Sequence, residues 1–224
     1  MKIDILTLFP EMFDGFINTS IIKRAIEKGL LEVNLINFRD YSPLNNKQVD
    51  DTPYGGGSGM ILRCEPIFEC LDSIDTKDAY IIMLSPEGTK YKQSVAKRLL
   101  EHKHLIILCG HYEGFDERIK TRVDEVISIG DYILTGGEIP SMAITDSIAR
   151  LIPGVITSKS LEDESFNSSL LDYPTYTKPS VYRGLEVPKV LLSGNHKNIE
   201  EYRNISRIEK TKILRPDLME EDHE

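Results

Sequence analysis

The chain has 224 residues, of which 40% are hydrophobic and 28% are charged, as is ordinary for a globular protein with a core of its own. Its formal net charge of −9 argues against a nucleic-acid partner unless basic residues gather on one part of the chain. The three cysteines lack Cys-x-x-Cys spacing and no apolar run is long enough for a membrane span, so we expect a reduced cytoplasmic protein without disulfides, a zinc site or a membrane segment.

Five apolar segments alternate with helical patterns along the first two thirds of the chain. The apolar segments are rich in Ile, Leu and Val and cover residues 3–9, 32–38, 79–84, 104–109 and 126–134. Helical periodicity is found at residues 13–28, 65–73, 93–101, 115–123 and 141–152. Strands that are apolar on both faces and alternate with helices are typical of a parallel sheet covered on both sides. The predicted fold class is therefore α/β.

Glycine-rich segments follow three of the later strands, at residues 85–88, 110–114 and 129–140. Ligands of parallel sheets bind beyond the carboxyl ends of the strands, and glycine leaves backbone N–H and C=O groups accessible to a flat ligand. Taken alone, the segment 129–140 fits a tight turn as well as a site. Together, the three segments predict a crevice for a small planar ligand.

The pattern changes after Ile152. Residues 157–169 are polar, acidic and serine-rich, which is typical of a flexible linker. The following residues, 170–224, contain proline-spaced extended pieces and a helical pattern at 198–214. Residues 175–216 hold nine Lys or Arg and four Glu, an excess of five positive charges. We predict a first domain at 1–156 and a small basic second domain at 170–224, although any one of these cations also fits a solvated helix face.

Several familiar motifs are missing. The segment GGGSGM at 55–60 lacks the Lys-Ser/Thr pair and the preceding strand of a phosphate-binding loop, and no G-x-G-x-x-G follows a first strand. No G-x-S-x-G nucleophile elbow is present. His102 and His104 have no third ligand near them in the sequence, so no metal site is predicted.

Eight segments form an ordered series: FPEMF at 9–13, VDDTPYGGGSGM at 49–60, LSPEG at 84–88, CGHYEG at 109–114, SIGDYILTGGE at 128–138, IPGV at 152–155, YTKP at 176–179 and LSGNH at 192–196. Together they resemble the bacterial tRNA (guanine-N(1))-methyltransferase family, TrmD, from residue 2 to about residue 218. The resemblance implies a SPOUT-class methyltransferase with a deep trefoil knot and a small, mainly helical C-terminal domain. Sequence patterns alone would predict an unknotted sheet, because knots are nearly absent among folds.

The resemblance also implies an activity and partners. S-adenosylmethionine would bind bent in the knot and give its methyl group to nitrogen 1 of the guanine at tRNA position thirty-seven, 3′ of the anticodon, where a guanine precedes it. The product, 1-methylguanosine, supports reading-frame maintenance. The partners would be the tRNA anticodon arm and a second copy of the chain, in a homodimer with active sites at the interface. Magnesium is implied for activity, although the sequence offers no dedicated set of metal ligands.

Matched position by position, the family's contacts fall into two groups. Cofactor contacts fall on the three glycine-rich segments, at Leu84, Ser85, Pro86, Gly110, Tyr112, Glu113, Ile129, Gly130, Tyr132, Ile133, Leu134, Gly136, Gly137 and Pro140. Substrate contacts are expected at Asp50, Tyr54 and Gly59 near the target guanine, and at Asp172, Lys178, Arg183, His196, Lys197 and Arg203 in the second domain.

Methylation of guanine N1 sets the chemistry that the site must supply. This nitrogen carries a proton at neutral pH, so the reaction needs a base, and a positive group must stabilise the charge that develops on the 6-oxo oxygen. The resemblance assigns the positive group to Arg150, which by itself also fits an exposed helix face. The base is assigned to Glu164, where the family usually has Asp, with Asp163 as the alternative register.

Two other classes of function fit parts of the sequence. A non-catalytic RNA- or nucleotide-binding module fits the departure at Glu164, and a small-molecule α/β enzyme fits the net charge of −9. The linker carboxylate and Arg150 favour the methyltransferase over the first alternative. The basic second domain favours it over the second.

Overall fold

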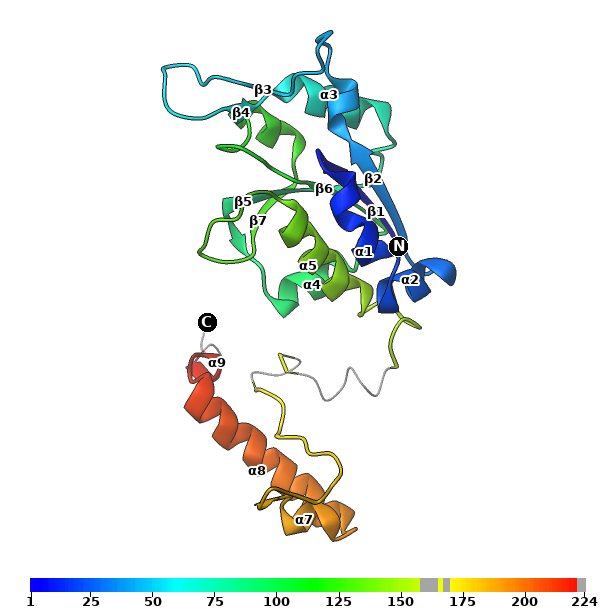
Figure 1. The fold of residues 1–224 in the computed structure, drawn as a ribbon, viewed down its shortest axis with the longest axis vertical. Helices are drawn as coiled ribbons and strands as arrows, with labels where there is room; N and C mark the ends of the chain where they lie inside the picture. The colour runs from blue at the N-terminus through cyan, green and yellow to red at the C-terminus, as the bar shows by residue number, and fades with distance from the viewer. Residues whose placement is uncertain (158–164, 167–169, 221–224) are drawn as a thin grey trace. The chain divides into compact units, whose positions relative to one another are not determined.

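The structure is a computed structural model that describes residues 1–157, 165–166 and 170–220 (Figure 1). The chain divides into two compact units, Met1–Ile156 (the first unit) and Thr157–Glu224 (the second unit). Most of the predicted linker 157–169 lies outside the described residues. Within the described ranges, no helix combines the length and the hydropathy that a membrane span requires.

A five-stranded parallel sheet forms the centre of the first unit (Figure 1). In chain order, its strands are β1 (Lys2–Thr7), β2 (Glu32–Asn37), β5 (Tyr80–Lys90), β6 (His104–Leu108) and β7 (Glu125–Ser128). Across the sheet they are ordered β2-β1-β6-β5-β7, and every neighbouring pair is parallel. The predicted α/β class with a parallel sheet is confirmed.

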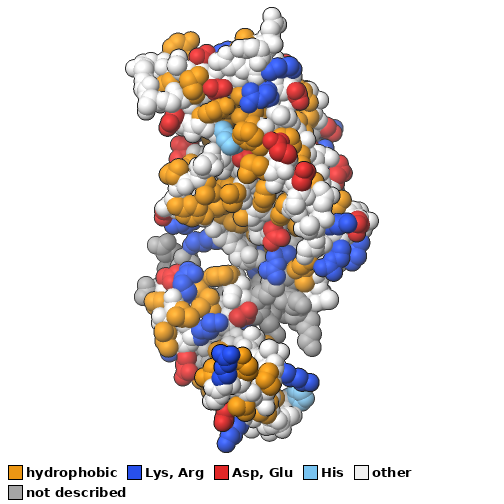
Figure 2. Space-filling view, in the orientation of Figure 1, with side chains coloured by type: hydrophobic (Ala, Val, Ile, Leu, Met, Phe, Trp, Pro, Cys, Tyr) orange, Lys and Arg blue, Asp and Glu red, His pale blue; other side chains and the backbone are white. Residues whose placement is uncertain are grey.

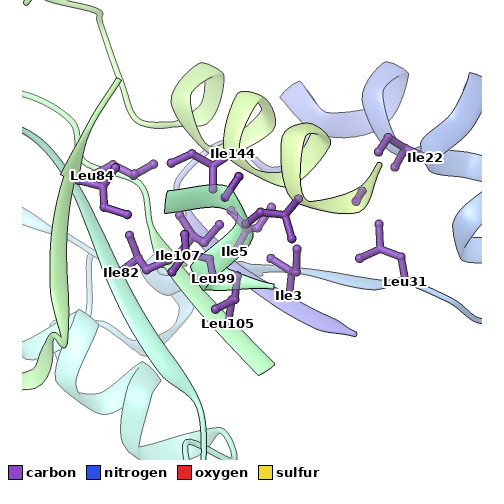
Figure 3. Packing of buried hydrophobic residues seen from close by; sticks show 14 of the residues in the cluster. Ile3, Ile5, Ile22, Leu31, Ile82, Leu84, Leu99, Leu105, Ile107 and Ile144 are labelled. Carbon is purple, nitrogen blue, oxygen red and sulfur yellow. The ribbon is translucent and has the colours of Figure 1, made fainter. Parts of the chain in front are cut away.

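Helices cover both faces of this sheet. On one face lie α2 (Ser20–Glu27), α4 (Gln93–Leu99) and α5 (Glu138–Ala149), packed over a cluster that includes Ile5 and Ile107 (Figure 3). On the other face lie α3 (Cys64–Ser73) and two 3-10 helices, η2 (Phe38–Tyr41) and η3 (Glu117–Arg122). Successive strand residues point to opposite faces, so Ile5 and Leu6 belong to different clusters. This alternation explains why the strands carry apolar residues on both faces.

Two helix predictions differ from the structure near the N-terminus. The helical pattern at 13–28 is divided among η1 (Pro10–Phe13), α1 (Asp14–Ile17) and α2, with a break between Ile17 and Ser20, the first residue of α2, whose φ is +53°. The Thr19 hydroxyl donates to the Gly15 carbonyl at 2.6 Å, which competes with continued helical bonding. The pattern at 115–123 forms the 3-10 helix η3 and no α-helix.

Two strand predictions and one helix boundary also differ. The strand expected at 126–134 ends at Ser128, two residues before Gly130, whose φ is +154°. The segment 85–88, expected as a loop after a strand, is an excursion within β5: Leu84 and Thr89 both pair with Ile127. Helix α5 begins at Glu138, three residues earlier than expected.

The second unit consists of short elements and one long helix. They are the antiparallel pair β8 (Val181–Tyr182) and β9 (Leu185–Glu186), followed by α7 (Lys189–Leu192), α8 (His196–Leu214) and α9 (Asp217–Glu220). The Asn195 side chain caps α8 by accepting the Asn198 N–H at 3.3 Å. Several apolar side chains of this unit are exposed, among them Leu185 and Ile213. Its core is therefore small.

A further small pair, β3 (Asp50–Asp51) and β4 (Ile61–Leu62), is antiparallel and belongs to the first unit. It carries the glycine-rich segment 52–60 between its strands. Four glycines of this segment, at 55, 56, 57 and 59, have positive φ. The backbone there follows a path that other residues adopt only with strain.

Candidate functional site

A cavity of about 260 Å³ lies beside the excursion of β5 and at the carboxyl ends of β6 and β7. The three glycine-rich segments form its walls. Every residue that the resemblance assigned to the cofactor lines it: Leu84, Ser85, Pro86, Gly110, Tyr112, Glu113, Ile129, Gly130, Tyr132, Ile133, Leu134, Gly136, Gly137 and Pro140. The lining residues that sequence reasoning missed are interleaved with these or flank them: His111, Gly114, Phe115, Ile127, Ser128 and Thr135.

The first wall exists because of the excursion in β5. Since Leu84 and Thr89 both pair with Ile127, the four residues between them leave the sheet. Gly88 then lies so close to β7 that a Cβ on it would be 2.5 Å from the Ile127 nitrogen. On the other side, the Lys120 ammonium holds the Glu87 carboxylate at 3.0 Å. The wall is shaped by close backbone packing and one exposed ion pair.

The segment 129–137 closes the cavity by packing on the end of β6. The Gly137 N–H donates to the Gly110 carbonyl at 2.9 Å, and Gly136 pairs with His111. A Cβ on Gly137 would lie 2.6 Å from Cys109 Cα. From the sequence, these glycines are expected to contact a ligand. In the structure, their missing Cβ atoms also let two segments of the chain meet.

Exposed apolar side chains surround the cavity. Tyr112, Tyr132 and Ile133 line it and are 50%, 54% and 80% exposed. Figure 2 shows hydrophobic side chains gathered on this face of the first unit, where Figure 1 has β5 and β7. Exposed apolar patches of this kind mark sites that bind a ligand or another protein.

The substrate segment between β3 and β4 is joined to the same site. The Glu113 N–H donates to the Met60 carbonyl at 2.9 Å. Gly59 rests against Glu113, because a Cβ there would be 2.4 Å from Glu113 Cγ. Tyr54 is fully exposed and Asp50 is half-buried. Tyr54 is thus exposed on the segment 52–60, which Gly59 connects to the wall of the cavity, and Asp50 lies in β3 just before this segment.

Of the expected catalytic residues, only Arg150 is described, and it does not line the cavity. Arg150 is the C-cap of α5, whereas Pro140 in the first turn of that helix lines the cavity. Ten residues of helix separate the two by about 15 Å along the axis. Glu164 and Asp163 lie outside the described residues.

The expected anticodon-arm residues belong to the second unit. Five are exposed cations or a histidine: Lys178, Arg183, His196, Lys197 and Arg203. Arg203 and Arg207 lie over the Tyr173 ring at 4.7 and 5.4 Å, beside a second cavity of about 520 Å³ that Lys178 also lines. Asp172 is half-buried, and its Oδ1 has no hydrogen-bond partner among the described residues.

Neither a thiol nucleophile nor a metal site is found in the part of the chain that the structure describes. Cys64, Cys70 and Cys109 are free and buried. Burial raises the pKa of the Cys109 thiol well above its usual range and that of Cys70 to about 12. Both are therefore thiols and not thiolates near neutral pH. No group of three His, Cys, Asp or Glu side chains in the described ranges could hold a metal ion.

The amino-acid sequence is similar to known proteins that share one description. A family model described as tRNA (Guanine-1)-methyltransferase TrmD matches residues 1–221. A tRNA (guanine-N(1)-)-methyltransferase of Malacoplasma penetrans is 54% identical over 218 residues, covering 97% of this chain and 96% of that protein. One from Carboxydothermus hydrogenoformans is 54% identical over 221 residues, with 98% and 87% covered. One from Staphylococcus aureus is 52% identical over 223 residues, with 98% and 91% covered.

Proposed function

We propose that this chain, which belongs to the tRNA (guanine-1)-methyltransferase family TrmD, methylates nitrogen 1 of the guanine at tRNA position thirty-seven. The methyl donor is S-adenosylmethionine and the product is 1-methylguanosine, which supports reading-frame maintenance. The observation that carries the proposal is the cavity between the three glycine-rich segments, because every residue expected to contact the donor lines it. Since the substrate is tRNA, we place the reaction in the cytoplasm.

The lining of the cavity fits this donor. Apolar side chains such as Leu84 and Ile129 suit the faces of an adenine ring, and the glycine-rich backbone suits its hydrogen-bonding edge. Glu113 supplies a negative group for a cation. When bound, the donor supplies an activated methyl group. The close packing of Gly137 on Cys109 supports a compact donor pocket of the trefoil-knot type.

We assign the proton transfer to Glu164 and the stabilisation of the 6-oxo oxygen to Arg150. Because Arg150 lies about 15 Å along α5 from Pro140, it is remote from the cavity of its own chain. A second copy of the chain could bring its Arg150 to this cavity. The apolar side chains of Met12, Ile133 and Ile139 are also exposed, and contact with a second chain would remove them from water. Both observations support a homodimer with active sites at the interface.

The remaining residues would hold the tRNA. The exposed cations of the second unit suit the phosphates of the anticodon arm, where contacts position the RNA without reading its sequence. Asp50 lies in β3 and Tyr54 in the segment that follows it, and the Met60 carbonyl at the end of that segment accepts the Glu113 N–H. This connection to the cavity wall supports the assignment of both residues to the guanine site. Magnesium would act through the substrate, the donor or Glu113, since the described side chains form no three-ligand cluster.

One assay tests the proposal. Labelled S-adenosylmethionine is incubated with the full chain and a tRNA transcript that has two consecutive guanines at the anticodon boundary. A second transcript has the second guanine replaced. We expect label on the first transcript and none on the second. Absence of transfer to both would refute the methyltransferase, and equal transfer to both would refute the assigned position.

A further inference from the structure

A buried carboxylate joins three parts of the chain beside the cavity. Glu138, the first residue of α5, is 1% exposed. Its Oε1 accepts a hydrogen bond from the Thr7 hydroxyl at 2.6 Å, and its Oε2 lies 2.7 Å from Nε2 of His111. Thr7 is the last residue of β1 and His111 lies just beyond β6. One side chain therefore connects the ends of two strands with the start of a helix.

The Thr7 hydroxyl makes two hydrogen bonds of defined direction: it accepts the Phe9 N–H at 2.9 Å and donates to Glu138. The contact between Glu138 and His111 needs one proton between the two side chains, and an ionised Glu138 takes that hydrogen bond from Nε2 of His111. The position of Glu138 at the start of a 12-residue helix adds the attraction of the helix dipole for a negative group. Removal of one member would leave buried polar groups without partners, which is costly.

The network lies where two walls of the cavity meet. His111 lines the cavity, and Gly136 of the facing segment pairs with it. A Cβ on Gly136 would lie 2.3 Å from His111 Cε1 and 2.5 Å from Glu138 Oε2. The Phe9 ring contacts the other side of His111, with 4.9 Å between the ring centroids. The backbone of segment 129–137 thus rests directly on the hydrogen-bonded pair.

We propose that Thr7 and Glu138 are positioning residues that fix His111, and through it the separation of the two cavity walls, for binding of the methyl donor. This inference rests on the proposed function of the cavity. Neither Thr7 nor Glu138 is among the described residues that line the cavity. Their effect on the donor must therefore pass through His111 and the backbone of segment 129–137. A merely structural network would change stability without changing donor affinity.

Two threonine substitutions in the full chain separate these roles. Thr7→Val removes the hydroxyl at nearly constant volume, and Thr145→Val is its matched control. Thr145 is equally buried, on α5, but its hydroxyl has no hydrogen-bond partner among the described residues. We expect Thr7→Val to raise the Kd for S-adenosylhomocysteine, measured by calorimetry, about tenfold, and Thr7→Ser to restore it to within about twofold. Thr145→Val should leave the Kd unchanged.

A third variant keeps the inference testable if Thr7→Val folds poorly. Glu138→Gln can still accept from Thr7, but its amide then donates to His111, whose Nε2 must become an acceptor. We expect a raised Kd together with a changed His111 tautomer in ¹⁵N NMR spectra, and a raised KM for the donor without a change in the KM for tRNA.

The outcomes are distinguishable. If Thr7→Val and Glu138→Gln bind S-adenosylhomocysteine as tightly as the unmodified chain and only lower the Tm, the network is structural and the inference is wrong. If the unmodified chain itself does not bind S-adenosylhomocysteine, the proposed function is wrong, and the inference that rests on it is wrong as well.

Discussion

Replacement of Gly137 by Ala should destabilise the first unit and weaken donor binding. Gly137 has φ −83° and ψ −4°, which alanine adopts without strain, so the effect arises from contacts alone. The new methyl would lie 2.6 Å from Cys109 Cα and 2.8 Å from the Gly110 nitrogen. Both are main-chain atoms of a buried strand end and cannot move aside. The segment must retreat, which stretches the 2.9 Å hydrogen bond from Gly137 to Gly110.

The size of this effect follows from its two parts. Overpacking costs about 1–3 kcal/mol and the weakened hydrogen bond about 1 kcal/mol, so the free energy of unfolding should fall by about 2–4 kcal/mol. For a protein of this size that lowers the Tm by roughly 4–16 °C. Calorimetric titration with S-adenosylhomocysteine should show a raised Kd, because Gly137 lines the cavity.

Gly15 supplies the matched control. It lies in α1, and no atom comes within 4 Å of a Cβ placed there. Gly15→Ala should leave donor binding unchanged and stabilise the chain by up to about 1 kcal/mol, because alanine favours a helix. If Gly137→Ala and Gly15→Ala have the same Tm and the same Kd, the close approach of segment 129–137 to β6 is not required, and the account of the cavity is wrong.

Three further outcomes are expected. Glu164→Gln should slow single-turnover methylation by about 10²–10⁴-fold while Asp163→Asn keeps it, and the reverse result would move the base to Asp163. Pairwise alanine substitution of the exposed cations of α8 should raise the KM for tRNA and flatten its salt dependence at unchanged donor Kd; an equal loss of donor binding would indicate misfolding instead. Arg150→Ala and Gly137→Ala each lower the activity, at donor concentrations below the raised Kd of Gly137→Ala, and mixing their subunits should restore part of it, since one interface then pairs an intact cavity with an intact arginine. Failure to complement would place the whole site within one chain.

The sheet and the cavity could be predicted from the sequence because both depend on local signals. Strands with apolar residues on both faces require cover on both, and β1 and β6 have that cover. Two of the glycine-rich segments follow the ends of β6 and β7, and parallel strands bring those ends to one edge. The helix that bears Arg150 was also foreseen, although its start at Glu138 was not.

The features that escaped prediction depend on contacts between distant residues. Segment 85–88 has the composition of a turn, but β5 resumes after it because Thr89 and Lys90 find partners in β7. The hydrogen bond between Thr7 and Glu138 spans 131 residues, so no local pattern announces it. From the sequence, Glu138 is expected to be a polar residue at the end of a loop, but in the structure its side chain is buried.

The position of β1 within the sheet has a consequence for synthesis of the chain. This strand leaves the ribosome first and can pair early with β2, but its other neighbour is β6, and Leu6 pairs with Leu108. Because the ribosome adds about 5–20 residues per second, the edge of β1 that pairs with β6 stays unpaired for roughly 5–20 s after β1 emerges. An unpaired apolar edge invites pairing with other chains. The nascent chain is therefore most open to such mispairing before β6 is made.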